Sequence, residues 1–168
     1  MKALRIAAPG SAEVCEIDQP TPGPGEVLLK VDFCGFCGGD LNAFRGTFPL
    51  QQYPCVLGHE IGGRIVELGP DAPERLANGM RVTVSPYSAR GVCPSCRRGR
   101  PNACRDNRTM GVRRPGAMSE FVAVACDDVI GSPKLGTREL AMVEPLSVGF
   151  HAIARGRVAA EDTVAVFG

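Results

Sequence analysis

The residue types best suited to chemistry lie together between residues 37 and 60. Cys37, Asp40, His59 and Glu60 supply a thiol, an imidazole and two carboxylates, and glycines surround both ends of the stretch. Cysteine sulfur and histidine nitrogen are preferred zinc ligands, and a catalytic zinc site uses about three protein ligands with one position left open. Cys37 and His59 are 22 residues apart, too far for a local zinc-finger loop. They form one site only if the fold brings two strand ends together.

The adjacent pair His59-Glu60 places a further demand on the backbone. Neighbouring side chains of a regular strand point to opposite faces, so both can serve one site only where the chain kinks. Gly58, Gly62 and Gly63 make such a kink inexpensive. Taken singly, a cysteine here would be a small buried apolar residue and a histidine a packed core residue. The metal interpretation depends on the whole cluster.

Three further cysteines make a second cluster of candidate metal ligands. Two residues separate Cys93 from Cys96, and seven separate Cys96 from Cys104. A closed structural zinc site normally has four ligands, so one ligand is missing from this set. The other four cysteines have no ligand-like spacing and are predicted to be core or loop thiols: Cys15, Cys34, Cys55 and Cys126.

Length and composition limit the remaining possibilities. The chain has 168 residues, enough for one domain with a real core, a net charge of +1 and only 5% aromatic residues. We therefore expect no basic patch or aromatic platform for nucleic acid. No apolar run approaches the length of about 18 residues that a membrane span needs, and the N-terminus lacks the apolar core of a signal peptide. With eight cysteines and no export signal, metal binding is favoured over disulfides, and the predicted location is the cytoplasm.

Twenty-one glycines and fourteen prolines divide the chain into short segments, which favours a barrel of short strands over a helical bundle. Residues 86–110 lack apolar periodicity and are predicted to form a protruding loop. Apolar alternation and turn signals predict strands at residues 2–8, 14–17, 26–33, 61–68, 80–84 and 119–125.

Helices are predicted at three places. Residues 40–45 form a short helical turn, residues 137–142 form a helix capped by Thr137 with Glu139 as an early acid, and another helix follows Pro145. The apolar run 162–168 then reads as a buried strand that ends at Gly168.

Several motifs resemble those of the zinc-dependent medium-chain alcohol dehydrogenase family. The Gly-His-Glu of residues 58–60, followed by glycines at 63 and 69 and an alanine at 72, is similar to its zinc signature. The segment from Gly35 to Asp40 resembles the one that supplies its first zinc ligand. The cysteine cluster and the Glu-Pro-Leu-Ser-Val-Gly of residues 144–149 extend the similarity over essentially the whole chain. The last motif is most similar to the branch that holds sorbitol, threonine and sugar-acid dehydrogenases.

The resemblance implies roles for the first cluster. Cys37 as thiolate and neutral His59 are the expected catalytic zinc ligands. Glu60 and Glu144 are candidate carboxylate ligands; the alternative for Glu144 is a position just outside the ligands or an ordinary helix-end role. Asp40 is expected to orient His59 by accepting its other ring proton, and its alternative is a turn or cap residue.

The resemblance also implies a structural zinc in the cysteine lobe, held by four cysteines in the family. Here Arg90 stands where the first of those cysteines is expected, so two interpretations stay open: zinc held by Cys93, Cys96, Cys104 and a substitute ligand, or three free thiols in a metal-free loop.

The usual proton path of the family departs as well. Gly39 and Asn42 replace a hydroxyl residue and a frequent histidine, and neither relays a proton; water, Glu60 or Glu144 are the candidate substitutes. The remaining histidine, His151, is predicted to be a packed helix residue.

By resemblance, the chain is an α+β, mainly β protein: a GroES-like, partly open barrel with short helices and a projecting cysteine-rich lobe. Residues 1–160 would be the zinc catalytic domain, and residues 161–168 the first strand of a truncated dinucleotide-binding domain, with Gly168 the first glycine of the cofactor turn. The implied reaction is hydride transfer between a small secondary alcohol, a polyol or sugar acid, and NAD or NADP. The full-length protein would be a homo-oligomer, and this chain alone would be inactive. The alternative is a GroES-like zinc-binding or regulatory protein that has lost catalysis, which the residues at 39 and 42 favour.

Overall fold

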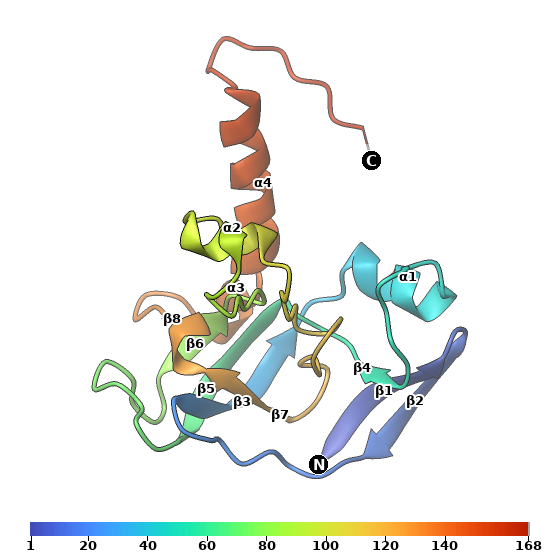
Figure 1. The fold of residues 1–168 in the computed structure, drawn as a ribbon, viewed down its shortest axis with the longest axis vertical. Coiled ribbons are helices and arrows are strands. Elements are labelled where there is room, and N and C mark those ends of the chain that lie inside the picture. Colours follow the sequence, from blue (N-terminus) through green and yellow to red (C-terminus); the bar gives the residue numbers. More distant parts are fainter. Residues whose placement is uncertain (168) are drawn as a thin grey trace.

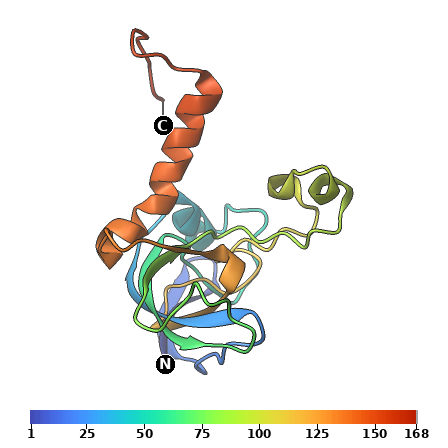
Figure 2. The ribbon, with the colours of Figure 1, turned by 90° about the vertical axis from the view of Figure 1, so that its left-hand side faces the viewer.

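The structure is a computed structural model, and it describes residues 1–167. Two antiparallel sheets form a partly open barrel, from which one helix projects (Figure 1) and one lobe extends sideways (Figure 2). The smaller sheet has the order β2-β1-β4 and the larger the order β7-β3-β5-β6-β8. Ala3 of β1 also pairs with Ser119, just before β7, which joins the two sheets. The expected mainly β architecture is therefore confirmed.

The strands agree with the sequence prediction at most positions. Their bounds are β1 Lys2–Ala8, β2 Ser11–Glu16, β3 Glu26–Cys34, β4 Cys55–Val56, β5 Ile61–Leu68, β6 Arg81–Val84, β7 Phe121–Ala125 and β8 Val129–Gly131. The strand predicted at 14–17 starts earlier, because Ser11 already pairs with Ala8 across the turn. The strands β4 and β8 were not predicted, since two or three residues carry no alternation of their own.

The barrel core lies against the larger sheet. Alternate residues of neighbouring strands point inward, and Val27, Leu29, Ile65, Val82 and Val124 are at most 1% exposed. Each such side chain stabilises the fold by about 1.5–3 kcal/mol relative to an exposed one. The result is a rigid barrel that fixes where β3 ends and β5 begins.

The helix α3 (Thr137–Ala141) packs on β5 with its backbone. A Cβ on Gly62 would lie 1.7 Å from the carbonyl oxygen of Thr137, so only glycine permits this approach. The N-cap of α3 is Gly136, and no side chain caps it. The predicted Thr137 cap is therefore wrong: Thr137 is the buried first residue of the helix.

The helix α4 (Val143–Gly156) follows α3 after a single residue and leaves the barrel (Figure 1). It begins before Pro145, which lies in the first turn, where proline is tolerated because its missing N–H would be unpaired anyway. His151 is exposed on this helix, so the prediction of a packed residue is wrong. Several apolar side chains of α4 are exposed too: Leu146, Val148, Phe150 and Ile153.

Residues 86–109 make up the lobe, which projects sideways from the barrel (Figure 2), and the chain returns to the barrel core at Met110. The expected protruding loop is confirmed, with two short additions, the helix α2 (Pro94–Arg97) and a 3₁₀ turn at Pro101–Ala103. A second 3₁₀ turn covers Cys126–Asp128, and α1 spans Gly38–Arg45. In the described part of the chain, no helix is long and apolar enough to cross a membrane.

The segment 162–167 does not form the predicted buried strand. It has no strand pairing within residues 1–167, and Val166 and Phe167 are 90% and 94% exposed. An apolar run becomes a strand only where another strand takes up its backbone hydrogen bonds. Gly168, the predicted cofactor residue, lies outside the described residues.

Candidate metal centres and the adjoining cleft

Three residues of the first cluster converge at one end of the barrel. Ligand atoms of Cys37, His59 and Glu60 all lie within 4.8 Å of one another. The pairing of β3 with β5 explains how this happens, because Cys34 at the end of β3 is the register partner of Ile61 at the start of β5. The backbone N–H of Gly35 donates to the carbonyl of Glu60 at 2.7 Å, which extends the pairing to the site.

The kink that His59 and Glu60 require lies at Gly58. Its φ is +96°, and an added Cβ would lie 2.6 Å from the sulfur of Cys34. Gly35 is equally constrained, since a Cβ there would lie 2.1 Å from Oε2 of Glu60. These two glycines allow both adjacent side chains to reach the same site.

Asp40 holds the two ligand-bearing segments together. Its carboxylate is 3% exposed and accepts the backbone N–H of Cys37 at 2.9 Å and that of Gly58 at 3.3 Å. The expected hydrogen bond to the His59 ring is not formed, because Oδ1 lies 3.9 Å from Nδ1, beyond hydrogen-bond range. Asp40 thus acts on the backbone on both sides of the site.

The donor set fits zinc. A thiol, an imidazole and a carboxylate are the side chains that make three-ligand zinc sites. Nδ1 of His59 is buried and has no hydrogen-bond partner within residues 1–167. Buried polar atoms in proteins are rarely left unpaired, so this set calls for a ligand or water that the protein itself does not provide.

Burial raises the pKa of Glu60, the charge of His59 opposes that rise, and the carboxylates of Glu144 and Asp40 add to it. Glu144 therefore lies close enough to Glu60 to affect its ionisation, although it is not one of the three converging ligands. It is buried in the first turn of α4, where the helix dipole favours a negative charge.

Tyr87 is a site residue that the sequence prediction missed. Its hydroxyl donates to Oε1 of Glu144 at 3.4 Å. Burial raises the pKa of Tyr87, and the negative charges of Glu144 and Cys37 raise it further, so the phenol keeps its proton at neutral pH. No local pattern marks this residue, because it lies in the irregular segment that follows β6.

A cleft of about 360 Å³ opens onto this centre. Cys37, His59, Asp40 and Tyr87 line it together with Gly39. Asn42 is not among the lining residues and is exposed on α1. The two positions that carry the proton relay in the family therefore differ here. Gly39 lines the cleft but has no group that transfers a proton, and Asn42 does not line the cleft.

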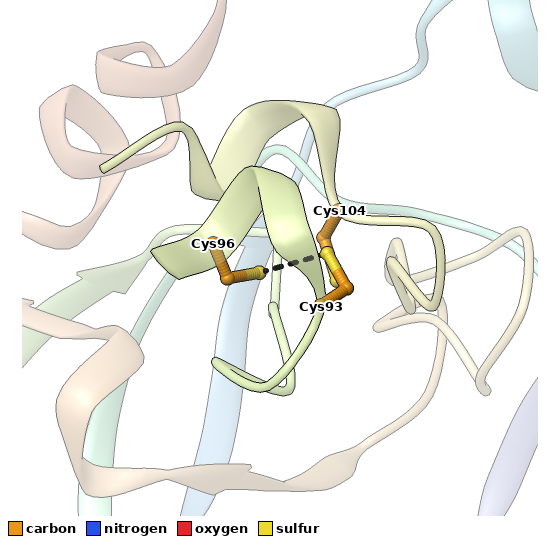
Figure 3. Close-up of side chains that lie close together, drawn as sticks. All are labelled: Cys93, Cys96 and Cys104. Atoms are coloured by element: carbon orange, nitrogen blue, oxygen red, sulfur yellow. Dashed lines mark hydrogen bonds between the residues drawn. The ribbon is translucent and has the colours of Figure 1, made fainter. Parts of the chain in front are cut away.

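The second cluster lies in the lobe (Figure 3). The sulfur atoms of Cys93, Cys96 and Cys104 lie within 4.8 Å of one another, and those of Cys93 and Cys96 are 3.5 Å apart. Backbone N–H groups of Cys96 and Arg105 lower the pKa of Cys93 to about 6, which favours the thiolate that metals bind. Within the described residues, no fourth cysteine, histidine or carboxylate joins this group. Arg90 instead lines a separate hollow.

The remaining cysteines are free thiols, as predicted. Cys126 packs in the barrel core, Cys34 lies beside the first cluster, and burial raises the pKa of Cys34 to about 12.

Comparisons with known proteins relate this chain to oxidoreductases. The family model described as "Alcohol dehydrogenase GroES-like domain" matches residues 23–134. L-galactonate-5-dehydrogenase of Escherichia coli (strain K12) is 38% identical over 149 residues, which cover 89% of this chain and 44% of that protein. Sorbitol dehydrogenase of Halalkalibacterium halodurans is 36% identical over 172 residues, which cover 100% of this chain and 50% of that protein.

Among solved structures, a short chain alcohol dehydrogenase of E. coli CFT073, complexed with NADH, superposes with a TM-score of 0.88 at 33% identity. The match covers 97% of this chain and 48% of that one. The chain spans about half the length of the curated relatives it matches.

Proposed function

Because the chain belongs to the alcohol dehydrogenase GroES-like domain family, we propose that its protein is a zinc-dependent dehydrogenase. The reaction is hydride transfer between a small secondary alcohol, a polyol or sugar acid, and NAD or NADP. One observation carries the proposal: ligand atoms of Cys37, His59 and Glu60 converge within 4.8 Å of one another, and Cys37 and His59 line an open cleft. The names of the two curated relatives and the NADH complex of the structural neighbour support the substrate class and the cofactor.

Cys37, His59 and Glu60 would hold the zinc, and Asp40 keeps the segments that carry them in register through its two backbone hydrogen bonds. Zinc at such a site lowers the pKa of a bound hydroxyl and so favours its loss of a proton. Glu144, buried near Glu60, supplies a further carboxylate next to the reacting centre.

The proton of the alcohol needs a route to solvent, and Gly39 offers none. Tyr87 lines the same cleft and donates a hydrogen bond to the buried carboxylate of Glu144, and both groups can exchange protons. We assign the proton transfer to Glu144, with Tyr87 holding its carboxylate in place. The homo-oligomeric state, the cytoplasmic location, and the assignment of residues 161–168 to a cofactor domain stay part of the proposal.

The test uses the protein expressed from its complete gene, with His59→Ala compared with His151→Ala. The second variant is the matched control, because His151 is exposed on α4, away from the cleft. Zinc per chain is measured by elemental analysis, and reduction of NAD and of NADP is followed with sorbitol and galactonate. His59→Ala should lose one zinc and at least about 100-fold in activity, while His151→Ala keeps both.

Zinc that survives in His59→Ala would place the metal elsewhere and contradict the proposal. If His59→Ala loses its zinc but the unmodified protein oxidises none of the alcohols, the result would favour the non-catalytic alternative.

A further inference from the structure

The near-neutral charge of the chain hides a concentration of arginine. Residues 86–118 contain eight arginines and one acidic residue, Asp106, a local charge of +7 in a chain whose net charge is +1. The lobe that holds the cysteine cluster is strongly cationic, and it borders the zinc cleft.

Three of these arginines line one hollow. Arg90, Arg108 and Arg113 surround a space of about 630 Å³, and Asp106 is the one acidic residue among its lining. Asp106 also lies 3.9 Å from Nε of Arg105, which is not part of the lining, and the three lining arginines outnumber this one carboxylate. The hollow therefore has an excess of positive charge.

Within residues 1–167, the guanidinium groups of Arg90, Arg108 and Arg113 have neither an ion pair nor a hydrogen-bond partner. Other arginines of the chain do: Arg114 pairs with Asp128 at 3.3 Å, and Arg97 donates to the carbonyl of Val92. The three arginines are exposed and line one space, and the planar donor pairs of guanidinium groups match the oxygens of a carboxylate or phosphate.

The hollow adjoins the candidate zinc cleft, because Leu50, Gln51, Asn107 and Arg113 line both spaces. A molecule whose hydroxyl carbon lies at Cys37 therefore has the arginines in the neighbouring space. Together the two spaces have the size of an ordinary small-molecule site.

Resting on the proposed function, we propose that this hollow is an anion subsite that holds the far end of the substrate. The substrate is then an acidic polyol, with a carboxylate or a phosphate at the end remote from the alcohol that is oxidised. Arg90 gains a role in this scheme: at the position where the family resemblance leads one to expect a zinc cysteine, the chain carries an anion-binding side chain.

The first experiment measures binding without turnover. Three six-carbon probes, D-sorbitol, D-gluconate and sorbitol 6-phosphate, are titrated calorimetrically at low salt into the full protein and into Arg108→Gln/Arg113→Gln. Arg98→Gln is the control, since Arg98 belongs to the same cationic lobe but lines neither space. Charged hydrogen bonds of this kind change affinity about tenfold or more each, so the double variant should lose about 10–100-fold for the anionic probes and nothing for sorbitol.

The relative affinities of gluconate and sorbitol 6-phosphate distinguish a carboxylate subsite from a phosphate subsite. Equal binding of sorbitol and both anionic probes, or anion binding unchanged in the double variant, would overturn the inference.

Steady-state kinetics distinguishes a failure of the anion subsite from a failure of the proposed function. A zinc-containing enzyme that oxidises sorbitol, and whose kcat/KM for gluconate and sorbitol 6-phosphate is unchanged in the double variant, retains the dehydrogenase function and refutes the subsite. Anion binding that is lost in the double variant, in a protein with no dehydrogenase activity, refutes the function while the arginines still bind the anion.

Discussion

Replacing Asp40 by asparagine tests whether one carboxylate holds the two halves of the zinc site together. The substitution keeps the size of the side chain but turns one of its two oxygens into an N–H₂ group. In either orientation of the amide, one backbone donor, from Cys37 or from Gly58, then faces another donor. The segment that loses its bond is free to move away from the other.

The magnitude follows from burial. Asp40 is 3% exposed, and a hydrogen bond to a buried charged group contributes about 1.5–3 kcal/mol. We expect Asp40→Asn to lower the free energy of unfolding by about 2–3 kcal/mol, a fall in Tm of roughly 4–12 °C. Mutating a residue that positions a metal ligand typically lowers metal affinity about 10–100-fold, so zinc affinity should fall by a similar factor.

The assay is urea unfolding of the metal-free protein, together with competition for zinc against a chelator of known affinity. Asp127→Asn is the control, because Asp127 is exposed and makes no hydrogen bond or ion pair through its side chain within the described residues. Unchanged stability and unchanged zinc affinity in Asp40→Asn would refute the reasoning. Lower stability with full zinc affinity would restrict Asp40 to capping α1.

Three further changes test other parts of the site. Gly35→Ala should displace Glu60 and lower zinc affinity about tenfold or more, whereas Gly38→Ala, whose Cβ meets nothing within 4 Å, should not; equal affinities measured by chelator competition would contradict the packing. Tyr87→Phe should lower kcat about tenfold with little change in KM, since it removes a hydrogen bond to the Glu144 carboxylate; an unchanged kcat would exclude Tyr87 from the reaction. Burial holds the pKa of Cys34 at about 12 against an ordinary 9.0, so the unfolded chain releases this proton first and stability should fall as pH rises from about 9 to 12, by about 4 kcal/mol at most. The difference between the urea unfolding midpoints at pH 8 and pH 11 should be smaller in Cys34→Ala than in the unmodified protein. An equal difference in both proteins would assign the pH dependence to other groups.

Much of the site was predictable because its residues flank strands with clear patterns. The alternation at 26–33 and 61–68 identified β3 and β5, and the glycines beside His59 indicated the kink that Gly58 provides. The pairing of Cys34 with Ile61, which brings Cys37 to His59, is a tertiary contact between segments that the sequence shows only separately.

The position of Glu144 illustrates what the sequence does not contain. It depends on the approach of α3 to β5, which Gly62 permits through the absence of a side chain. Tyr87 and the arginine hollow were missed for a similar reason, since net charge and spacing along the chain do not reveal which residues face one space. The strand predicted at 162–168 is not formed over residues 162–167, because apolar composition alone supplies no partner for the backbone hydrogen bonds.

The place where α4 leaves the barrel has a mechanical consequence. Its first turn carries Glu144 beside the candidate zinc ligands, and the helix then runs outward for about 21 Å at 1.5 Å per residue. Its base is fixed, because α3 rests on β5 backbone to backbone. With its base held, the helix would pivot there, so that a rotation of its exposed outer part would change the position of the Glu144 carboxylate relative to Glu60.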